Sequence, residues 1–591
     1  MKSVLKNLKS ELCRVHEVSD NEMETFSNYT HLQRYHPAID LFKIPELENH
    51  KNLELPSKYH IEKWESQDES KFWDTTRKDR KDTEEPCKTF VKVIHLLNPI
   101  DTIKEKYICP DHPLIPQSEN TWKKTLKKIH NHNNQAYVDT VANFVLSRFR
   151  ELNLTPHCVL YYGSATGISK LYQYNISNEY ETYRQCRWFW NGMKSHNANL
   201  KIIGDVPEEM YDEIMECPFD EDEVLADIEK VEISVESINS YTFDNIDEDA
   251  DNVCDIFEIN SKITGKQLET KTDLDELDLD ALDLTEMESD EMDESDEMDE
   301  SDEMDESDES DESDELDLEI CLEIPNMPVI LIYQEAQEGV LDELLEVDEI
   351  DNCKRGTQGW EARWIAWLFQ VITVLSFLQN AICFTHNDLH SNNIIWRKTD
   401  KKFLYYKAKD NTVWRVPTFG KIFSIIDFGR SIFRLGKHLW VSDDHWPDQD
   451  AGEQYNFGPF FNHKEPKVPP NPSFDLCRLS VSLIDGLFDE PPPKKKGKGV
   501  PIMSEEDSWK VYETNSPLYN LLWNWTVDKN GHTVYQYENG DEKYEGFELY
   551  IRIAHDVTNS VPKDQIYKPI FQQFKWTQKV PQDETIYSIG A

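Results

Sequence analysis

The chain has 591 residues and a formal net charge of −52 at pH 7, and nearly all of this charge comes from one internal segment. Residues 201–353 hold 59 of the 114 acidic residues and 5 of the 62 basic residues, so the rest of the chain has 55 acidic and 57 basic side chains. This nearly neutral remainder has the composition of a globular protein with a sizeable core, and its dispersed basic residues argue against nucleic-acid binding. The 11 cysteines form no C-x-x-C pair, which argues against a zinc knuckle or a disulfide framework and favours a cytoplasmic location.

The first predicted elements alternate between strand and helix. Residues 1–84 are expected to form an N-terminal extension that could include the first strands. Apolar residues alternate around Lys92 in "CKTFVKVIHLLNP" (87–99), a pattern typical of a strand. Apolar residues at helical spacing predict a helix over 135–152, and "HCVLYYGS" (157–164) has the composition of a second strand.

An acidic repeat interrupts this pattern. Residues 273–320 contain 28 acidic residues and no Lys or Arg, within a predicted insertion over 201–327. Such a composition cannot bury enough apolar surface to offset the entropy of ordering, so we expect residues 273–320 to be disordered. The segment is either a solvated product of repeat expansion or a phosphoacceptor tract, because Asp-Glu follows each repeat serine, a context that acidophilic kinases favour. The candidate self-phosphorylation sites are Ser289, Ser295, Ser301, Ser307, Ser310 and Ser313.

Apolar elements resume after the insertion. Residues 328–340 predict an apolar strand followed by a polar linker, and a long helix is predicted over 360–384. This helix is long enough to cross a membrane, but Gln370, Gln379 and Asn380 interrupt its apolar run. Its large apolar residues recur at spacings of three and four, which favours a buried helix, and no membrane association is expected.

Two polar motifs follow the helix. "THNDLHSNN" contains His386, Asp388 and Asn393 between apolar runs, and "IIDFGRS" places Asp427 after another apolar run. Polar clusters of this kind are either solvated loops or sites. Neither motif is specific alone, but the ordered pair is a strong signal. The alternative is a polar surface turn followed by an unrelated Asp-Phe-Gly loop.

In this order, H-x-D-L-x-x-x-N followed by D-F-G resembles the catalytic core of the protein-kinase superfamily. The resemblance implies an α+β, bilobal fold whose small lobe comprises residues 85–200 and 328–340 and contains the long disordered acidic insertion. The large lobe and a C-terminal tail would occupy residues 341–591. The phrases "FVKVIHLLNPID", "NNQAYVD" and "VPTFGKIFSIIDFGR" look most like divergent Ser/Thr kinase-like proteins of large cytoplasmic DNA viruses, which implies a location in the host cytoplasm or the virion.

The resemblance implies ATP and Mg²⁺ as cofactors and gives each motif a role. Asp388 would orient the acceptor hydroxyl, while Asn393 and Asp427 would hold Mg²⁺ through oxygen atoms. His386 is expected to brace the loop rather than act as a base. Asp475 in "SFDLCRL" looks like the buried aspartate of a later helix, with an ordinary helix N-cap as the alternative.

The resemblance also implies roles for residues of the small lobe. Lys92 resembles the V-A-I-K lysine that binds ATP phosphates, although a lone lysine in a strand is usually a solvated residue. Its expected partner is Asp139, the only acidic residue between positions 120 and 150, with a solvated helix charge as the alternative. The backbone of Gln334, Glu335 and Ala336 is expected to contact the adenine.

Three departures from the superfamily pattern leave the function open. No glycine precedes Gly163, so the Gly-rich phosphate loop is absent, and no A-P-E follows D-F-G. His390 stands where Lys is usual, and D-L-H occurs in haspin-like protein kinases and in aminoglycoside-type small-molecule kinases. The expected function is an ATP- and Mg²⁺-dependent phosphotransferase, with a Ser/Thr protein kinase acting on protein substrates as first choice. A pseudokinase or scaffold and a small-molecule kinase are the alternatives.

Overall fold

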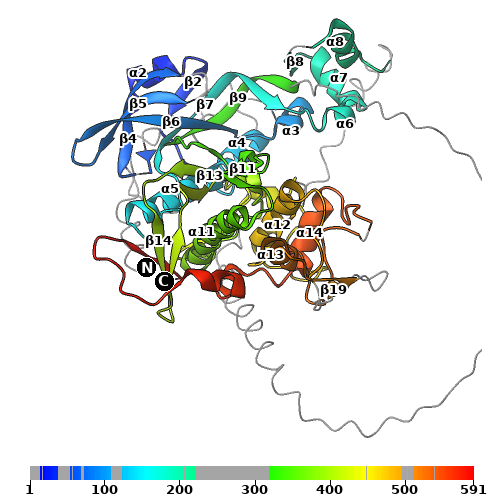
Figure 1. Ribbon diagram of the computed structural model, residues 1–591. Helices are drawn as coiled ribbons and strands as arrows, with labels where there is room; N and C mark the ends of the chain where they lie inside the picture. The colour runs from blue at the N-terminus through cyan, green and yellow to red at the C-terminus, as the bar shows by residue number, and fades with distance from the viewer. Residues whose placement is uncertain are drawn as a thin grey trace, which may run out of the picture.

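The computed structural model describes residues 14–15, 17–37, 53–55, 57–67, 72–107, 123–204, 206–219, 318–447, 449–495, 502–503, 510–537 and 539–590. Within these ranges the protein is mixed α and β, as expected from the sequence (Figure 1). The six repeat serines, and with them residues 273–317 of the tract expected to be disordered, lie outside the described residues.

A large antiparallel sheet dominates the N-terminal part of the described chain. Its strand order is β2-β7-β9-β6-β5-β4. Strand β8 pairs with the first five residues of β9, Glu319–Glu323. The strand predicted around Lys92 is confirmed as β6, and Lys92 lies opposite Ile332 of β9. The strands are β2 (Tyr29–Gln33), β4 (Tyr59–Gln67), β5 (Trp73–Asp79), β6 (Glu84–His95), β7 (Tyr161–Asn175), β8 (Asn199–Ile203) and β9 (Glu319–Glu335).

The strand β9 is longer than the sequence predicted. It begins at Glu319, whereas the insertion was expected to extend to residue 327, so the predicted boundary is wrong. Ile320, Leu322 and Ile324 are buried at this end of the strand, where β9 pairs with β7 and β8. Alternating apolar residues therefore form sheet structure although the segment as a whole is acidic.

Helix α5 (Gln135–Glu151) confirms the helix predicted over 135–152 and packs against the sheet (Figure 1). The Asn134 side chain accepts a hydrogen bond from the Ala136 backbone N–H and caps the helix. Nearly all of α5 is buried, including the polar residues Asp139 and Asn143. Buried polar side chains require partners, and those of α5 find them at the site described below.

Helix α11 (Gln358–Ile382) forms the core of the C-terminal part. Thr357 caps its start by accepting from the Trp360 N–H, and Cys383 ends it in a left-handed conformation. Among the described residues, α11 is the one helix long and apolar enough to cross a membrane, but 89% of its apolar window is buried inside the protein. This burial fits the core helix predicted from the sequence.

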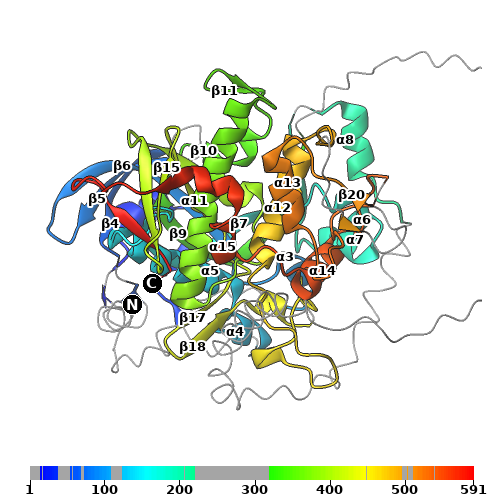
Figure 2. The same cartoon turned by 60° about the horizontal axis from the view of Figure 1, so that its bottom comes forward.

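Helices α12 and α13 lie beside α11 (Figure 2), and α11 also contacts β16 of a short antiparallel ladder. In this ladder β13 (Ile394–Lys398) pairs with β16 (Lys421–Ile425), and the antiparallel pair of β14 and β15 lies between them in the sequence. The remaining named elements include β14 (Phe403–Ala408), β15 (Val413–Pro417), α12 (Phe474–Leu487), α13 (Pro517–Trp525), α14 (Phe547–Asp556) and α15 (Pro562–Gln565). Shorter elements include α2 (Asp20–Thr25), α3 (Pro99–Ile103), α4 (Lys123–Ile129), α6 (Tyr180–Arg184), α7 (Arg187–Lys194) and α8 (Glu208–Met215).

Candidate functional site

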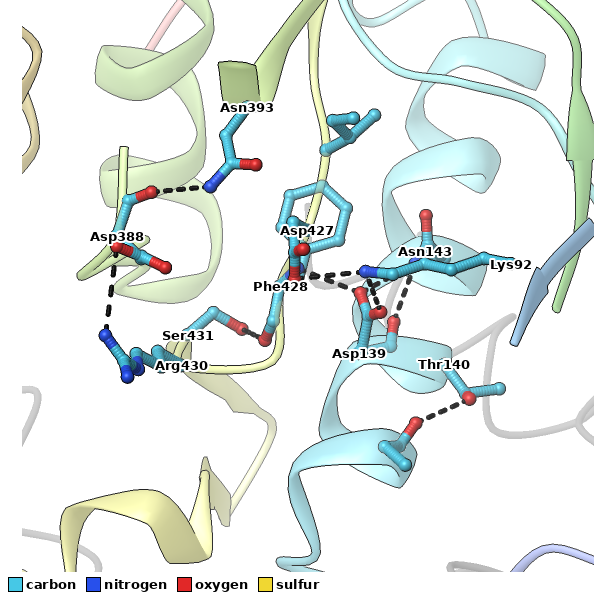
Figure 3. A network of polar contacts seen from close by, with 12 residues as sticks. Lys92, Asp139, Thr140, Asn143, Asp388, Asn393, Asp427, Phe428, Arg430 and Ser431 are labelled. Atoms are coloured by element: carbon cyan, nitrogen blue, oxygen red, sulfur yellow. Dashed lines mark hydrogen bonds and ion pairs between the residues drawn. The ribbon is translucent and has the colours of Figure 1, made fainter. Parts of the chain in front are cut away.

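The β13–β16 ladder brings the two sequence motifs together. Because the strands are antiparallel, the start of β13 lies beside the end of β16, and Ile394 pairs with Ile425. Asn393 precedes β13 and Asp427 follows β16, and the Ile426 N–H donates to the Asn393 carbonyl at 3.0 Å. Asn393 and Asp427, which are 34 positions apart in sequence, therefore meet at one edge of the ladder (Figure 3).

Hydrogen bonds to Asp475 hold the loop that contains Asp388. The Asp475 carboxylate accepts hydrogen bonds at 3.0 Å from the backbone N–H groups of His386 and Asn387, and all three residues are buried. Asp475 lies inside α12, whose N-cap is Ser473, so the alternative prediction of an N-cap is wrong. His386 Nε2 lies 2.8 Å from the Ile426 carbonyl, which agrees with a bracing role for this histidine.

Asp388 itself is only partly exposed. Its carboxylate accepts a hydrogen bond from the Tyr550 hydroxyl at 2.8 Å and lies 3.9 Å from the Arg430 guanidinium. The Asn393 side chain donates to the Asp388 carbonyl at 2.8 Å, so it fixes the loop and leaves its own Oδ1 as an acceptor. The Asn393 amide nitrogen also lies 3.1 Å from His390 Nε2.

The other half of the site is a lysine held between two carboxylates. Lys92 Nζ lies 2.7 Å from Asp139 Oδ2 and 3.0 Å from Asp427 Oδ1 (Figure 3). Asp139 is fully buried and accepts two more hydrogen bonds, from the Asn143 side chain and the Phe428 N–H, both at 2.9 Å. The structure thus brings together three of the residues singled out in the sequence, from β6, α5 and the D-F-G loop.

Charge and burial set the protonation of this cluster. Burial raises the pKa of Asp139, although the adjacent Lys92 ammonium opposes the shift. For Asp427 burial acts in the same upward direction, but Lys92 outweighs it and lowers the pKa of Asp427. The two carboxylates in turn raise the pKa of Lys92 against the effect of burial. The cluster therefore contains a stable ammonium and an ionised Asp427 whose side chain is 47% exposed.

Asp427 also has an unusual backbone conformation. Its φ of +64° lies in the left-handed region, which Asp and Asn enter more easily than most residues with a Cβ atom. The following Phe428 side chain is buried against Phe384 and His386. The turn therefore separates a buried aromatic anchor from a carboxylate that faces outward, a conformation often retained at functional sites.

The three residues expected at the adenine lie at the end of β9 and directly after it. The backbone N–H of Glu335 donates to the Leu160 carbonyl at 2.9 Å and that of Ala336 donates to the Lys88 carbonyl at 3.1 Å. The Gln334 side chain donates to Asn143, and the Glu335 carboxylate pairs with Arg150. The backbone N–H groups of Glu335 and Ala336 thus bind protein carbonyls, and the expected contact of residues 334–336 with an adenine stays a prediction.

Strand β5 pairs with β6 and begins near the level of Lys92. Trp73, the first residue of β5, pairs with Thr89, three residues before Lys92. Residues 68–71 of the connection between β4 and β5 lie outside the described residues, and no glycine occurs in it.

The donors of the site suit a magnesium ion that also binds phosphates. Asp427 presents a half-exposed carboxylate and Asn393 an amide oxygen, both hard oxygen donors of the kind Mg²⁺ prefers. Within the described residues no group of three or more His, Cys, Asp or Glu side chains could hold a metal by itself. Such a sparse protein ligand set fits Mg²⁺, which keeps waters and substrate phosphates as its other ligands.

Four residues at this site had no signal in the sequence. Tyr550 reaches Asp388 from α14, in a tail without recognisable motifs, and Arg430 bridges Asp388 and Asp444. Asp443 joins the D-F-G side to the start of α5, where it accepts from the Gln135 N–H at 3.1 Å and from Lys128 Nζ at 2.7 Å. Contacts over such sequence distances leave no periodic or motif pattern in a single sequence.

The raised pKa of the buried Asp444 predicts that the stability of the fold depends on pH. Burial raises the pKa of Asp444 to about 7, with Arg430 opposing and Asp443 adding to the shift. An aspartate with a raised pKa in the folded state stabilises the protein in its protonated form, so stability should fall as pH rises from about 4 to about 7. We expect Asp444→Asn to flatten this dependence and to stabilise the protein at pH 8 by on the order of a few kcal/mol. Urea unfolding of both proteins at pH 5 and pH 8 measures this, and an unchanged pH dependence would contradict it.

No family model matches the chain, and no curated protein matches it.

Proposed function

We propose that the chain is an ATP- and Mg²⁺-dependent phosphotransferase with the bilobal fold of the protein-kinase superfamily, and that it acts on Ser or Thr hydroxyls of proteins. The main support is the convergence of Lys92, Asp139 and Asp427 beside the loop of Asp388 and Asn393. The strand order of the large sheet and the buried Asp475 beneath the loop add to it. The acidic insertion would then be a disordered excursion of the small lobe.

The proposed roles follow from the contacts of each residue. Bound Mg²⁺ would neutralise charge on the ATP phosphates, with Asp427 and Asn393 as its protein ligands. Lys92, fixed by Asp139, would bind phosphate oxygens. Asp388 would orient the acceptor hydroxyl, whose oxygen attacks the γ-phosphorus while the bond to the bridging oxygen breaks and ADP leaves. The hydroxyl proton would pass to Asp388 and then to solvent.

Phosphoryl transfer from γ-labelled ATP to a protein mixture tests the proposal. We expect transfer by the wild type, its loss after Mg²⁺ removal with EDTA, and a reduction of about 100-fold in Lys92→Met, because the phosphates lose their fixed cation. Lys402→Met, which changes an exposed lysine on the β13–β14 turn, is the matched control and should retain activity. Wild-type protein without magnesium-dependent transfer would overturn the proposal of a protein kinase.

Two observations favour a second candidate, a pseudokinase scaffold. The amides of Glu335 and Ala336 are occupied by protein carbonyls, and the Tyr550 hydroxyl already contacts Asp388. Nucleotide binding separates the two functions. A rise in melting temperature with Mg²⁺ and ATP, together with transfer, supports the enzyme, whereas the absence of both supports the scaffold.

A further inference from the structure

A cavity of about 570 Å³ opens next to Asp388, on the side formed by the C-terminal part of the chain. Its walls come from the segment after β9, the loop that follows Asp388, α12 with the residues just after it, and Tyr550 of α14. A volume of this size accommodates a side chain with its neighbours or a small molecule. The lining residues are Asp342, Leu345, Glu346, Arg355, His390, Ser391, Asn392, Arg478, Ser482, Asp485, Gly486, Asp489 and Tyr550.

Tyr550 joins this cavity to the proposed site of transfer. Its hydroxyl donates to Asp388 Oδ1 at 2.8 Å and accepts from Arg478 Nε at 3.0 Å. The Tyr550 hydroxyl therefore occupies a position on Asp388 that an acceptor hydroxyl would also take. The cavity wall also includes His390 and Ser391, which directly follow Asp388 and Leu389. An acceptor bound at Asp388 would place the rest of its structure in this cavity.

Acidic side chains outnumber basic side chains in the cavity lining. Four carboxylates face two guanidinium groups, and both arginines already have partners: Arg355 donates to the Gly486 and Leu345 carbonyls, and Arg478 donates to Tyr550. In contrast, Glu346 and Asp489 are exposed and have no hydrogen bond or ion pair with any residue that the structure describes. The cavity thus presents unpaired negative charge to a ligand.

We propose that this cavity binds a cationic group of the acceptor, an ammonium or a guanidinium, while the acceptor hydroxyl lies at Asp388. The inference rests on the proposed function and names its substrate class. The cation could belong to a Lys or Arg near the accepting Ser or Thr of a protein, or to a hydroxylated polyamine. Both sources share the chemistry that Glu346 and Asp489 would recognise.

The test offers two kinds of cationic acceptor, and the peptides within one kind differ only in charge. Three Ser peptides with Arg, Gln or Glu at the flanking positions form one arm, and a hydroxylated polyamine of the aminoglycoside class forms the other. We expect transfer in one arm, and that arm identifies the source of the cation. In the peptide arm the wild type should prefer the Arg peptide to the Gln and Glu peptides. In Glu346→Gln/Asp489→Asn, KM for that acceptor should rise roughly tenfold, the combined effect of two exposed charge pairs. The kcat at saturation, KM for ATP and transfer to the Gln peptide should not change.

The control is Glu349→Gln/Glu490→Gln, which removes the same charge from exposed neighbours that do not line the cavity. Binding of a fluorescent Arg peptide without nucleotide, followed by anisotropy, provides a measurement independent of catalysis. Transfer without charge preference, or preference for the Glu peptide, would overturn the inference and leave the proposed function intact. Charge-selective binding that Glu346→Gln/Asp489→Asn weakens, in a protein that transfers no phosphate to either arm, would overturn the proposed function alone.

Discussion

Asp427→Asn is expected to reduce phosphoryl transfer by roughly 10³-fold, the scale seen when a group that stabilises transition-state charge is removed. Asn has nearly the same shape as Asp and also adopts the left-handed conformation found here, at φ +64°. Its amide oxygen can still accept from Lys92, which lies 3.0 Å from Asp427 Oδ1. The substitution therefore removes the negative charge and little else, so the loss would report on the charge that the metal and phosphates require.

Two measurements separate this effect from misfolding. The melting temperature of Asp427→Asn should stay close to that of the wild type, and the affinity for ATP should lose its dependence on Mg²⁺. Asp400→Asn, an exposed aspartate in the turn after β13, supplies the matched control. Retention of more than a tenth of wild-type transfer by Asp427→Asn would show that this carboxylate is not the principal metal ligand.

Lys128→Met is expected to destabilise the fold by about 3 to 5 kcal/mol, the usual cost of leaving one member of a buried ion pair without its partner. Lys128 Nζ lies 2.7 Å from Asp443 Oδ2, and both side chains are largely buried. Asp443 also accepts from the Asn131 side chain at 3.3 Å and from the Gln135 N–H. This carboxylate therefore connects the segment after the D-F-G loop to the first turn of α5.

Urea unfolding measures the loss, and a second substitution identifies its cause. Lys128→Met/Asp443→Asn removes the stranded charge as well, so it should be more stable than Lys128→Met alone. Lys127→Met changes the neighbouring lysine of α4 and leaves the ion pair between Lys128 and Asp443 in place, so it should have a much smaller effect. Equal destabilisation by the single and double variants would contradict an unpaired Asp443 as the cause.

The sequence predicted those parts of the site that depend on local patterns. Strand alternation placed Lys92 on a strand and an apolar run preceded Asp427, while the resemblance to the kinase motifs singled out both residues. Asp139 was the one acidic residue between positions 120 and 150. Each of these residues lies on an element whose periodicity or flanking residues can be recognised without its neighbours. Their convergence depends on the contacts that join β6, α5 and the D-F-G loop, and no local pattern describes these contacts.

Other features could not be predicted because they depend on strand pairing and on contacts between distant residues. The start of β9 was obscured because the acidic composition of the insertion extends to Glu319, although the alternation of Ile320, Leu322 and Ile324 was available as a signal. The occupied amides of Glu335 and Ala336 depend on where the strand pairing ends. Tyr550 reaches Asp388 across 162 residues, and no local pattern marks such a contact.

The contact between Tyr550 and Asp388 would affect the hydrolysis of ATP by water when no acceptor is bound. A kinase that waits for its acceptor with ATP bound is exposed to attack by water on the γ-phosphate, which wastes the nucleotide. Here a phenol, held in turn by Arg478, covers the carboxylate that would activate such a water. Under the proposed function, ATP hydrolysis without acceptor would be slow, and an acceptor would have to displace Tyr550 before the reaction could begin.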